Sequence, residues 1–263
     1  MTRSFLTSRT PALAGLLLVA TALSACGGEP ATEGAAPEAE RAVLVAPQVT
    51  GLGPASNGGL VLSGAARPGD RVRVTDSAGR AVGVTANADG AFAVSLPAPE
   101  RAEILQVTVL RPEGAAVADG FVFAPPGGRG AAVLRPGAAA VPLDPAAGLV
   151  AALDRDDGGS LALAGRGAAD QPVRISVDGA PAGETRTDAE GRFALRLDVR
   201  VAPGPRRVRV ETPAGAAERT IELIDSTGRR GLEGAPIEGG WSVRWPLPGG
   251  GGQTTYLFLR DPA

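Results

Sequence analysis

The sequence predicts an all-β fold in which a seven-stranded β-sandwich occurs twice in tandem. Three observations predict it: short runs in which polar and apolar residues alternate, Gly-containing turn signals between these runs, and an internal repeat of the whole pattern. Alternation with a period of two buries one face of a β-strand. Short strands separated by turn signals at intervals of about 8–12 residues are typical of sandwiches.

The repeat emerges when Leu60–Ala116 is placed over Leu161–Ala217, a shift of 101 residues without a gap. Seventeen of the 57 aligned pairs are identical, whereas composition alone would give roughly six. The identical pairs include apolar strand positions and turn glycines, such as Leu62/Leu163, Val72/Val173, Gly90/Gly191 and Phe92/Phe193. We therefore predict that one module has been copied.

Residues 1–25 have the parts of an export signal. Arg3 and Arg9 precede the apolar run Pro11–Ala20, and the small residues Ser24 and Ala25 follow. A positive start, a short apolar run and a small-residue cleavage site are typical of a secretory signal peptide. The run is shorter than the roughly 20 residues that a transmembrane helix needs.

The only cysteine of the chain, Cys26, directly follows that cleavage site. The stretch Leu23-Ser24-Ala25-Cys26 resembles the lipobox of bacterial lipoproteins. The resemblance implies that Cys26 is lipidated, becomes the mature N-terminus and anchors the chain in a membrane. Gly27 is not the aspartate that retains many such proteins in the inner membrane, which implies an outer-membrane location facing the periplasm.

Residues 26–42 combine several acids and prolines with almost no large apolar side chains. Such a composition cannot form a packed core, so we expect a disordered tether.

The first module is predicted at 43–124 and the second at 147–226. In the first, strands are expected near 43–49, 60–64, 71–75, 81–86, 91–96, 104–110 and 117–123. The second copy repeats this set from about Gly148 to Ile224. Between the strands, Asp89-Gly90 and Glu190-Gly191 are typical of tight hairpin turns.

Three acids near the start of the second module, Asp154, Asp156 and Asp157, are a candidate calcium site. Calcium takes six to eight oxygen ligands, and the corresponding stretch Gly53–Asn57 of the first module carries no acid. We therefore favour a solvated loop. The turns at 87–90 and 188–191 offer two side chains each, so hairpin turns are preferred there as well.

A Pro- and Gly-rich linker is predicted at 125–146, with Ala131–Leu134 and Ala140–Leu143 as candidate edge strands. Flexibility between the modules is the default expectation for such a segment.

Residues 227–263 are predicted to form a C-terminal hairpin with a Gly-rich connection. Trp241, Trp245 and Tyr256 lie close together in it. We expect them to pack the hairpin onto the second module. The alternative is an exposed aromatic patch that binds a glycan or a protein, since Trp and Tyr are enriched in binding hot spots.

Composition excludes much chemistry. The chain has no histidine, no lysine and a single cysteine. A histidine general base, a Ser-His-Asp triad, a zinc site of the usual Cys/His type and an internal disulfide are therefore excluded. Removal of the predicted signal peptide, with Arg3 and Arg9, would leave 24 of the 26 arginines and all 28 acids, so the mature chain would be mildly acidic. The sequence has no basic cluster of the kind that indicates a nucleic-acid partner. We expect no cofactor.

The stretches Leu62–Thr75 and Gly79–Phe92 resemble bacterial Ig-like modules of surface and envelope proteins. In the second copy, Leu161–Gly165 matches, and Thr187–Leu195 is equally similar to carboxypeptidase regulatory-like modules. The resemblance implies two tandem seven-stranded Ig-like β-sandwiches, a role in adhesion, spacing or scaffolding, and no catalytic residues.

Together these features predict a non-catalytic, lipid-anchored envelope protein with a structural, adhesive or scaffolding role. The expected partners are the membrane, reached through the N-terminal lipid, and an envelope protein or peptidoglycan. The alternatives are glycan or peptidoglycan binding through the C-terminal aromatic segment and a hydrolase, or its accessory subunit, that uses paired carboxylates alone.

Overall fold

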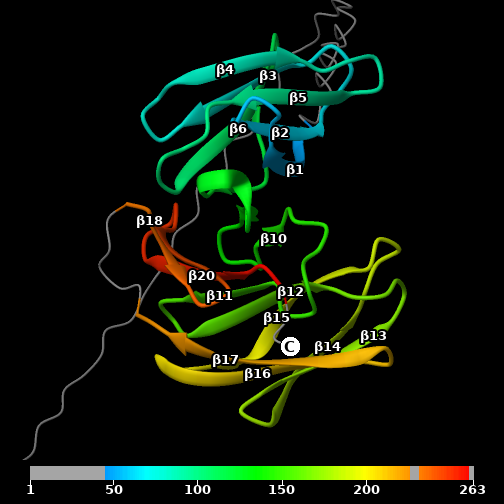
Figure 1. Cartoon of the computed structure of the whole chain (residues 1–263), viewed down its shortest axis with the longest axis vertical. Helices are drawn as coiled ribbons and strands as arrows, with labels where there is room; N and C mark the ends of the chain where they lie inside the picture. The colour runs from blue at the N-terminus through cyan, green and yellow to red at the C-terminus, as the bar shows by residue number, and fades with distance from the viewer. Residues whose placement is uncertain (1–44, 226–230, 261–263) are drawn as a thin grey trace, which may run out of the picture. The chain divides into compact units, whose positions relative to one another are not determined.

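The computed structural model describes residues 45–225 and 231–260, which belong to one compact unit. Its regular elements are strands, apart from one 3-10 turn, η1 (Pro126–Gly128) (Figure 1). This confirms the predicted all-β fold. The predicted signal peptide and tether, with Cys26 and Gly27, lie outside the described residues. Within the described ranges, no helix is long and apolar enough to cross a membrane.

The first module holds two antiparallel sheets. A three-stranded sheet has the order β1-β2-β5, and the other sheet contains β8-β6-β3-β4, with β7 also paired to β6. The strands are β1 (Gln48–Pro54), β2 (Leu60–Ala65), β3 (Arg71–Asp76), β4 (Ala81–Thr85), β5 (Ala91–Leu96), β6 (Glu103–Arg111), β7 (Gly114–Val117) and β8 (Phe121–Ala124).

Two of the predicted strands of this module are placed differently. The first strand covers 48–54 rather than 43–49, because a tight turn in which the Ala55 N–H donates to the Gly59 carbonyl fixes its register against β2. The predicted strand 117–123 is two strands, β7 and β8. Between them Gly120 has a positive φ of 116°, and a Cβ at this position would collide with the Leu134 carbonyl.

The second module repeats the framework strand by strand. Its sheets contain β15-β12-β11 and β14-β13-β16-β17, in the same order as the corresponding strands of the first copy. The strands are β11 (Ala152–Asp156), β12 (Ser160–Arg166), β13 (Pro172–Val177), β14 (Ala180–Arg186), β15 (Arg192–Arg200), β16 (Gly204–Thr212) and β17 (Gly215–Leu223). The topology therefore supports the duplication inferred from the sequence.

Each module has its own apolar core, and aligned positions of the repeat occupy equivalent places in the two cores. The buried pairs are Leu60/Leu161, Leu62/Leu163, Val72/Val173, Phe92/Phe193 and Val107/Val208. In β3 the burial of Val72 and Val74 alternates with exposed arginines, as the period of two predicts.

Five further strands extend this duplicated framework. The predicted linker forms β9 (Ala132–Leu134) and β10 (Val141–Pro142), which continue the first module's sheet beyond β8. The C-terminal segment forms β18 (Glu233–Ile237), β19 (Gly240–Pro246) and β20 (Gly252–Phe258). Strand β20 pairs with β11, so the predicted hairpin continues the second module's sheet instead of lying on its face.

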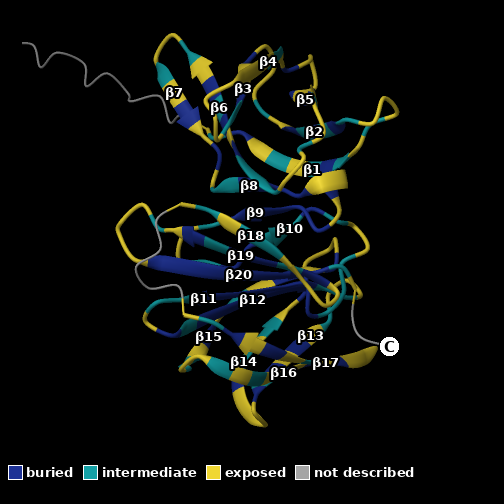
Figure 2. Cartoon of the chain, turned by 60° about the vertical axis from the view of Figure 1, so that its left-hand side comes forward, coloured by how far each residue is buried: buried dark blue, intermediate teal, exposed yellow. Residues whose placement is uncertain are grey.

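A third apolar cluster joins the two extensions. Phe123, Leu134 and Ala140 contribute to it from the first module and from the segment after it, and Trp245 and Leu257 contribute from the C-terminal strands. Figure 2 shows β20 buried along its length. The segment predicted as a linker therefore buries apolar side chains against the second module's sheet, which its Pro and Gly content did not reveal.

Candidate binding groove

The C-terminal aromatic residues are mainly packing residues. Trp245 and Tyr256 are each only 2% exposed. The Trp245 Nε1–H donates to Thr255 Oγ1 over 3.1 Å, and the Tyr256 hydroxyl accepts from the Ile224 N–H over 2.7 Å. Burial raises the pKa of Tyr256. The alternative of an exposed aromatic patch is therefore wrong for Trp245 and Tyr256.

Trp241 is half-buried and lies against the first module. Its ring contacts Phe123 edge-on, with centroids 5.8 Å apart, and its Nε1–H donates to the Arg129 carbonyl over 3.3 Å. Trp245 contacts Phe121 in the same manner at 6.3 Å. Packing was the correct expectation, but the tryptophans pack against β8 of the first module as well as within the second module's sheet.

Asp154 does not lie in a solvated loop, contrary to the sequence-based expectation. It sits in β11 between two paired strands and is 3% exposed. Its carboxylate accepts hydrogen bonds from the Thr255 hydroxyl, from Gln253 Nε2 at 2.8 Å and from the Ala140 N–H at 2.7 Å. Desolvation by burial raises its pKa to about 6, although these three donors oppose the shift.

The other two candidate calcium ligands also have protein partners. Asp156 Oδ1 accepts from the Ser160 N–H at 2.8 Å and closes the turn between β11 and β12. Asp157 Oδ2 accepts from the Gly252 N–H at 2.5 Å. Across residues 45–225 and 231–260, no three His, Cys, Asp or Glu side chains are grouped so as to hold a metal ion. The three acids therefore accept hydrogen bonds that hold strands and turns together.

The two duplicated turns are tight turns, but they are not the hairpin turns expected from the sequence, because each joins strands of different sheets, β4 to β5 and β14 to β15. Asn87 Oδ1 accepts from the N–H groups of Asp89 and Ala91 at 3.0 and 2.8 Å. Asp188 Oδ1 accepts from the equivalent Glu190 and Arg192 N–H groups at 3.0 and 2.7 Å.

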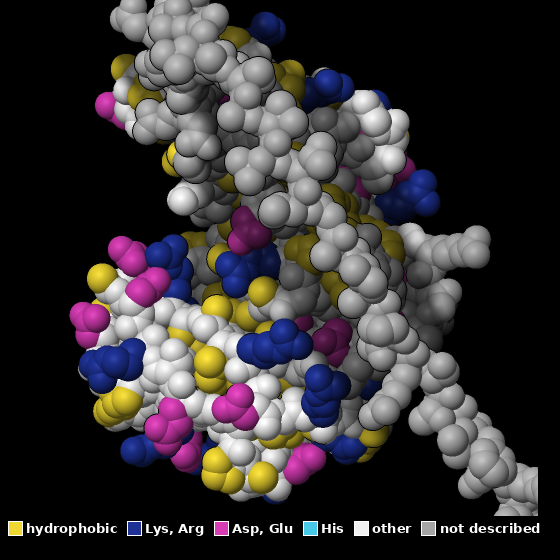
Figure 3. All heavy atoms as spheres, turned by 180° about the vertical axis from the view of Figure 1, so that it is seen from behind, with side chains coloured by type: hydrophobic (Ala, Val, Ile, Leu, Met, Phe, Trp, Pro, Cys, Tyr) yellow, Lys and Arg dark blue, Asp and Glu magenta, His cyan; other side chains and the backbone are white. Residues whose placement is uncertain are grey.

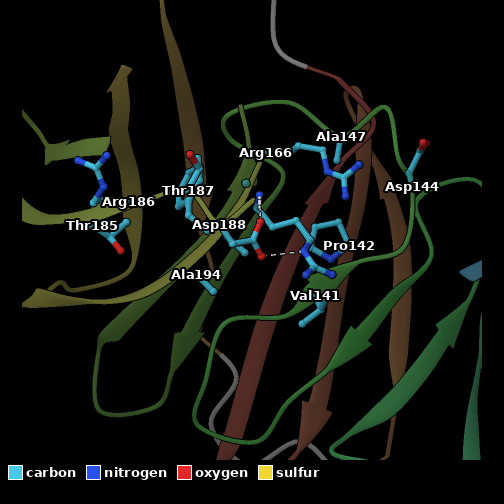
Figure 4. Close-up of a pocket in the computed structure, with 14 residues that line it drawn as sticks. Val141, Pro142, Asp144, Ala147, Arg166, Thr185, Arg186, Thr187, Asp188 and Ala194 are labelled. Carbon is cyan, nitrogen blue, oxygen red and sulfur yellow. Dashed lines mark hydrogen bonds and ion pairs between the residues drawn. The ribbon is translucent and has the colours of Figure 1, made fainter. Parts of the chain in front are cut away.

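A concave feature not anticipated from the sequence is a groove along residues 141–145, called here the 141–145 groove. One hollow of about 530 Å³ runs between β1 and this segment. A second hollow of about 380 Å³ lies over β12, β15 and the end of β14 (Figure 4). Both are lined by the same five residues, Val141, Pro142, Asp144, Arg166 and Arg192, so the hollows are continuous.

Charged side chains of both signs line this groove, and two arginines line both of its hollows. Arg166 on β12 lies directly opposite Arg192 on β15 in the antiparallel ladder. Arg192 contacts the carboxylates of Asp188 at 3.0 Å and Glu190 at 3.1 Å, while the Arg166 Nη1–H donates to the Pro145 carbonyl at 3.2 Å. In the first module the equivalent ladder pair is Ala65 opposite Ala91. Comparing the two aligned copies for such charge changes would have drawn attention to this pair.

Comparison with known proteins bears on the first module. Residues 46–124 match a family model described as a bacterial Ig domain. The match begins and ends within a few residues of the predicted module at 43–124. No curated protein matches the chain.

Two solved structures illustrate how distant the structural likenesses are. A carbohydrate acetylesterase from Xanthomonas citri is 21% identical, with a TM-score of 0.25, over 30% of this chain and 18% of that one. The BSP domain of a biofilm-associated protein is 17% identical, with a TM-score of 0.25, over 70% of this chain and 30% of that one. This chain therefore spans less than a third of either structure's length, and neither likeness carries a functional argument.

Proposed function

We propose that this protein is a lipid-anchored protein of the cell envelope with a non-catalytic structural, adhesive or scaffolding role. The observation that carries the proposal is the bacterial Ig domain at 46–124, repeated as a second module of the same strand order. The apolar cluster shared by the two extensions supports a two-module body that presents one surface to a partner.

The placement of the acids supports binding rather than hydrolysis. Within the described part of the chain, the buried acids are Asp70 and Asp154. Asp70 in the first module is held by Arg111 at 2.6 Å, and Asp154 in the second is held by three donors. A carboxylate-based glycosidase needs two acids about 5–9 Å apart on either side of the bond that breaks. These two belong to different modules and are engaged in structural contacts.

The surface charges do not favour a nucleic acid as partner. Figure 3 shows arginine and acidic side chains interspersed over one face of the second module. Arg209 on β16, for example, pairs with Glu211 on the same strand at 2.8 Å and with Glu218 on the neighbouring β17 at 3.6 Å. Phosphate binding needs a clustered basic surface, so an envelope protein or peptidoglycan is the better partner class.

Anchoring is tested by replacing the only cysteine. We expect the wild-type chain in the membrane fraction and the Cys26→Ser variant in the soluble fraction, because the thiol is the attachment point for the lipid. Ser24→Ala is the matched control, since it changes the same segment but keeps the thiol, and should stay membrane-bound. A Cys26→Ser variant that remains fully in the membrane fraction would contradict the anchor.

Sorting and binding are tested separately. Gly27→Asp should move the protein from the outer to the inner membrane, and an unchanged location would contradict the role of Gly27. Crosslinking in intact cells should capture a discrete envelope partner or peptidoglycan fragments. A chain that crosslinks to neither at its native level would contradict the adhesive or scaffolding role.

A further inference from the structure

The first strands of the two modules have different neighbours. Strand β11 lies between β12 and β20, whereas β1 pairs with β2 alone among the described strands. Strands β1 and β11 are equivalent in register, because the pair Leu52–Leu62 of the first module corresponds to the pair Leu153–Leu163 of the second. Leu153 also pairs with Tyr256 of β20. The edge that β20 covers in the second module therefore has no paired strand in the first, and only η1 among the described elements outside β2 packs closely against β1, beside Gly53.

The backbone of β1 presents hydrogen-bonding groups to that open edge. The Ala55 N–H donates to the Gly59 carbonyl, which is on the side of β2. Since successive residues of a strand point their N–H and C=O groups to alternate sides, Leu52 and Pro54 direct theirs away from β2. Leu52 offers both a donor and an acceptor, and Pro54 offers only its carbonyl.

The shape of the open edge fits a single strand. All seven residues of β1 line the 141–145 groove together with Val61 and Ser63 of β2, and residues 141–145 form its opposite side. This opposite side restricts the approach of a second whole sandwich. The register irregularity between Val49 and Gly51, together with Pro54, also disfavours a long ladder with another copy of β1.

The charge of the groove indicates what kind of strand it fits. Arg166 and Arg192 are a directly opposed pair of like charges, an arrangement that destabilises a sheet. Asp188 and Glu190 lie beside Arg192, and Asp144 is the acid that lines both hollows. Arg192 already has two carboxylate partners, whereas the Arg166 guanidinium donates to the Pro145 carbonyl. A ligand carboxylate would therefore form its charge-assisted hydrogen bonds chiefly with Arg166.

We propose that an extended, acidic segment of a partner polypeptide adds as a strand to the open edge of β1 and places a carboxylate against Arg166. The main-chain bonds to β1 supply the affinity, and Arg166 selects an acidic sequence. This inference names the partner class for the proposed adhesive role. Its test uses purified protein and does not depend on the lipid anchor or on envelope location.

The experiment uses a probe that copies the strand accepted by the second module. The peptide carries the sequence of β20, Gly-Gln-Thr-Thr-Tyr-Leu-Phe, with a glutamate added at each end. A control peptide has lysine at both ends. With the purified full-length chain, we expect the glutamate peptide to bind at least tenfold more tightly. We also expect it to slow hydrogen exchange of the Leu52 amide at least tenfold, with no change at Val82 on the edge strand β4.

Charge reversal tests the role of Arg166. Arg166→Glu should invert the preference between the two peptides, and the milder Arg166→Gln should abolish it. Arg174→Glu, which changes an exposed arginine on β13, is the matched control and should leave the preference unchanged. The fold of each variant is checked by its thermal unfolding midpoint.

Three results would overturn the proposal. One is equal or undetectable binding of both peptides. Another is binding that leaves exchange at Leu52 unchanged, which would place the peptide elsewhere. The third is protection of Leu52 that rises with protein concentration in the absence of peptide, which would identify a second copy as the occupant.

Discussion

The two modules share a framework and differ in how their sheets are extended. The first module continues at β8, through β9 and β10, whereas the second continues at β11, through β20, β19 and β18. As a result the same framework strand is an edge in one copy and a central strand in the other. The difference shows that burial at a repeated position depends on the strands added to the framework, and not on the repeat alone.

A second difference lies at the entrance to the third strand of each module. In the first module Asp70 and Arg111 form a buried ion pair, with Nε–Oδ1 and Nη2–Oδ2 distances of 2.9 and 2.6 Å. The equivalent position in the second module is Gln171, whose N–H donates to Thr187 Oγ1 at 2.8 Å. One copy thus uses a charged pair and the other a neutral hydrogen bond at the same place.

The largest expected effect tests how far the second module depends on its added strands. Trp245→Ala removes a 2% exposed side chain from β19 and leaves a cavity against Phe121. We expect the free energy of unfolding to fall by about 3–5 kcal/mol, as for other large-to-small core changes. Urea unfolding followed by circular dichroism measures it. Trp241→Ala, at a half-buried site, is the control and should cost clearly less; equal losses would contradict the difference in packing.

The next effect tests the charged pair of the first module. Arg111→Ala leaves Asp70 buried without its cation, so we expect a loss of at least about 2 kcal/mol. The Arg111 guanidinium holds the pKa of Asp70 below its usual range, so the pair persists at mildly acidic pH. A double variant, Asp70→Gln with Arg111→Thr, copies the residues of the second module. It should recover part of the loss in urea unfolding, and a larger loss than in Arg111→Ala would contradict the equivalence.

Local patterns in the sequence were sufficient to predict the framework strands. The alternation in Arg71–Thr75 and the tight turns at Asp89-Gly90 and Glu190-Gly191 depend on neighbouring residues only, and the structure contains both. Which strands a turn joins depends on the sheets, and these two turns join strands of different sheets. Strand β1 was misplaced because its Gly- and Pro-containing sequence has a weak period, and its register is set by the turn to β2.

Contacts between distant segments account for the features that were missed. Asp154 looked like part of a solvated acidic loop because the strand that covers it, β20, lies about a hundred residues further on. Arg166 and Arg192 face each other only through the ladder of β12 with β15. Neither a period nor a motif records such pairings. A position-by-position comparison of the two copies singles out Arg166 and Arg192, which stand where the first module has Ala65 and Ala91.

The pH dependence of unfolding tests Asp154, the buried carboxylate of the second module. The aligned position of the first module is Gly53. Because burial raises the pKa of Asp154 to about 6 in the folded state, folding favours its protonated form. Its contribution to stability is present at low pH and is lost as the pH rises through about 6. Between pH 7 and pH 5 we expect a gain of about 1 kcal/mol that is missing in Asp154→Asn. If the stability of the wild type and that of Asp154→Asn changed in parallel with pH, the raised pKa of Asp154 would be contradicted.

The smallest expected effect concerns the duplicated turns, where the copies differ in charge but not in geometry. Asn87 and Asp188 accept the same two backbone N–H groups, and Asp188 also contacts Arg192 through an exposed ion pair at 3.0 Å. Exposed ion pairs contribute little, so Asn87→Asp and Asp188→Asn should each change the free energy of unfolding by less than about 0.5 kcal/mol. Alanine at either position removes the acceptor and should cost about 1 kcal/mol. Two results would show that the turn depends on its charge and not on its hydrogen bonds. One is that the Asn/Asp swaps destabilise the protein as much as the alanine variants do. The other is that calcium raises the thermal midpoint of the wild type but not that of Asp188→Asn.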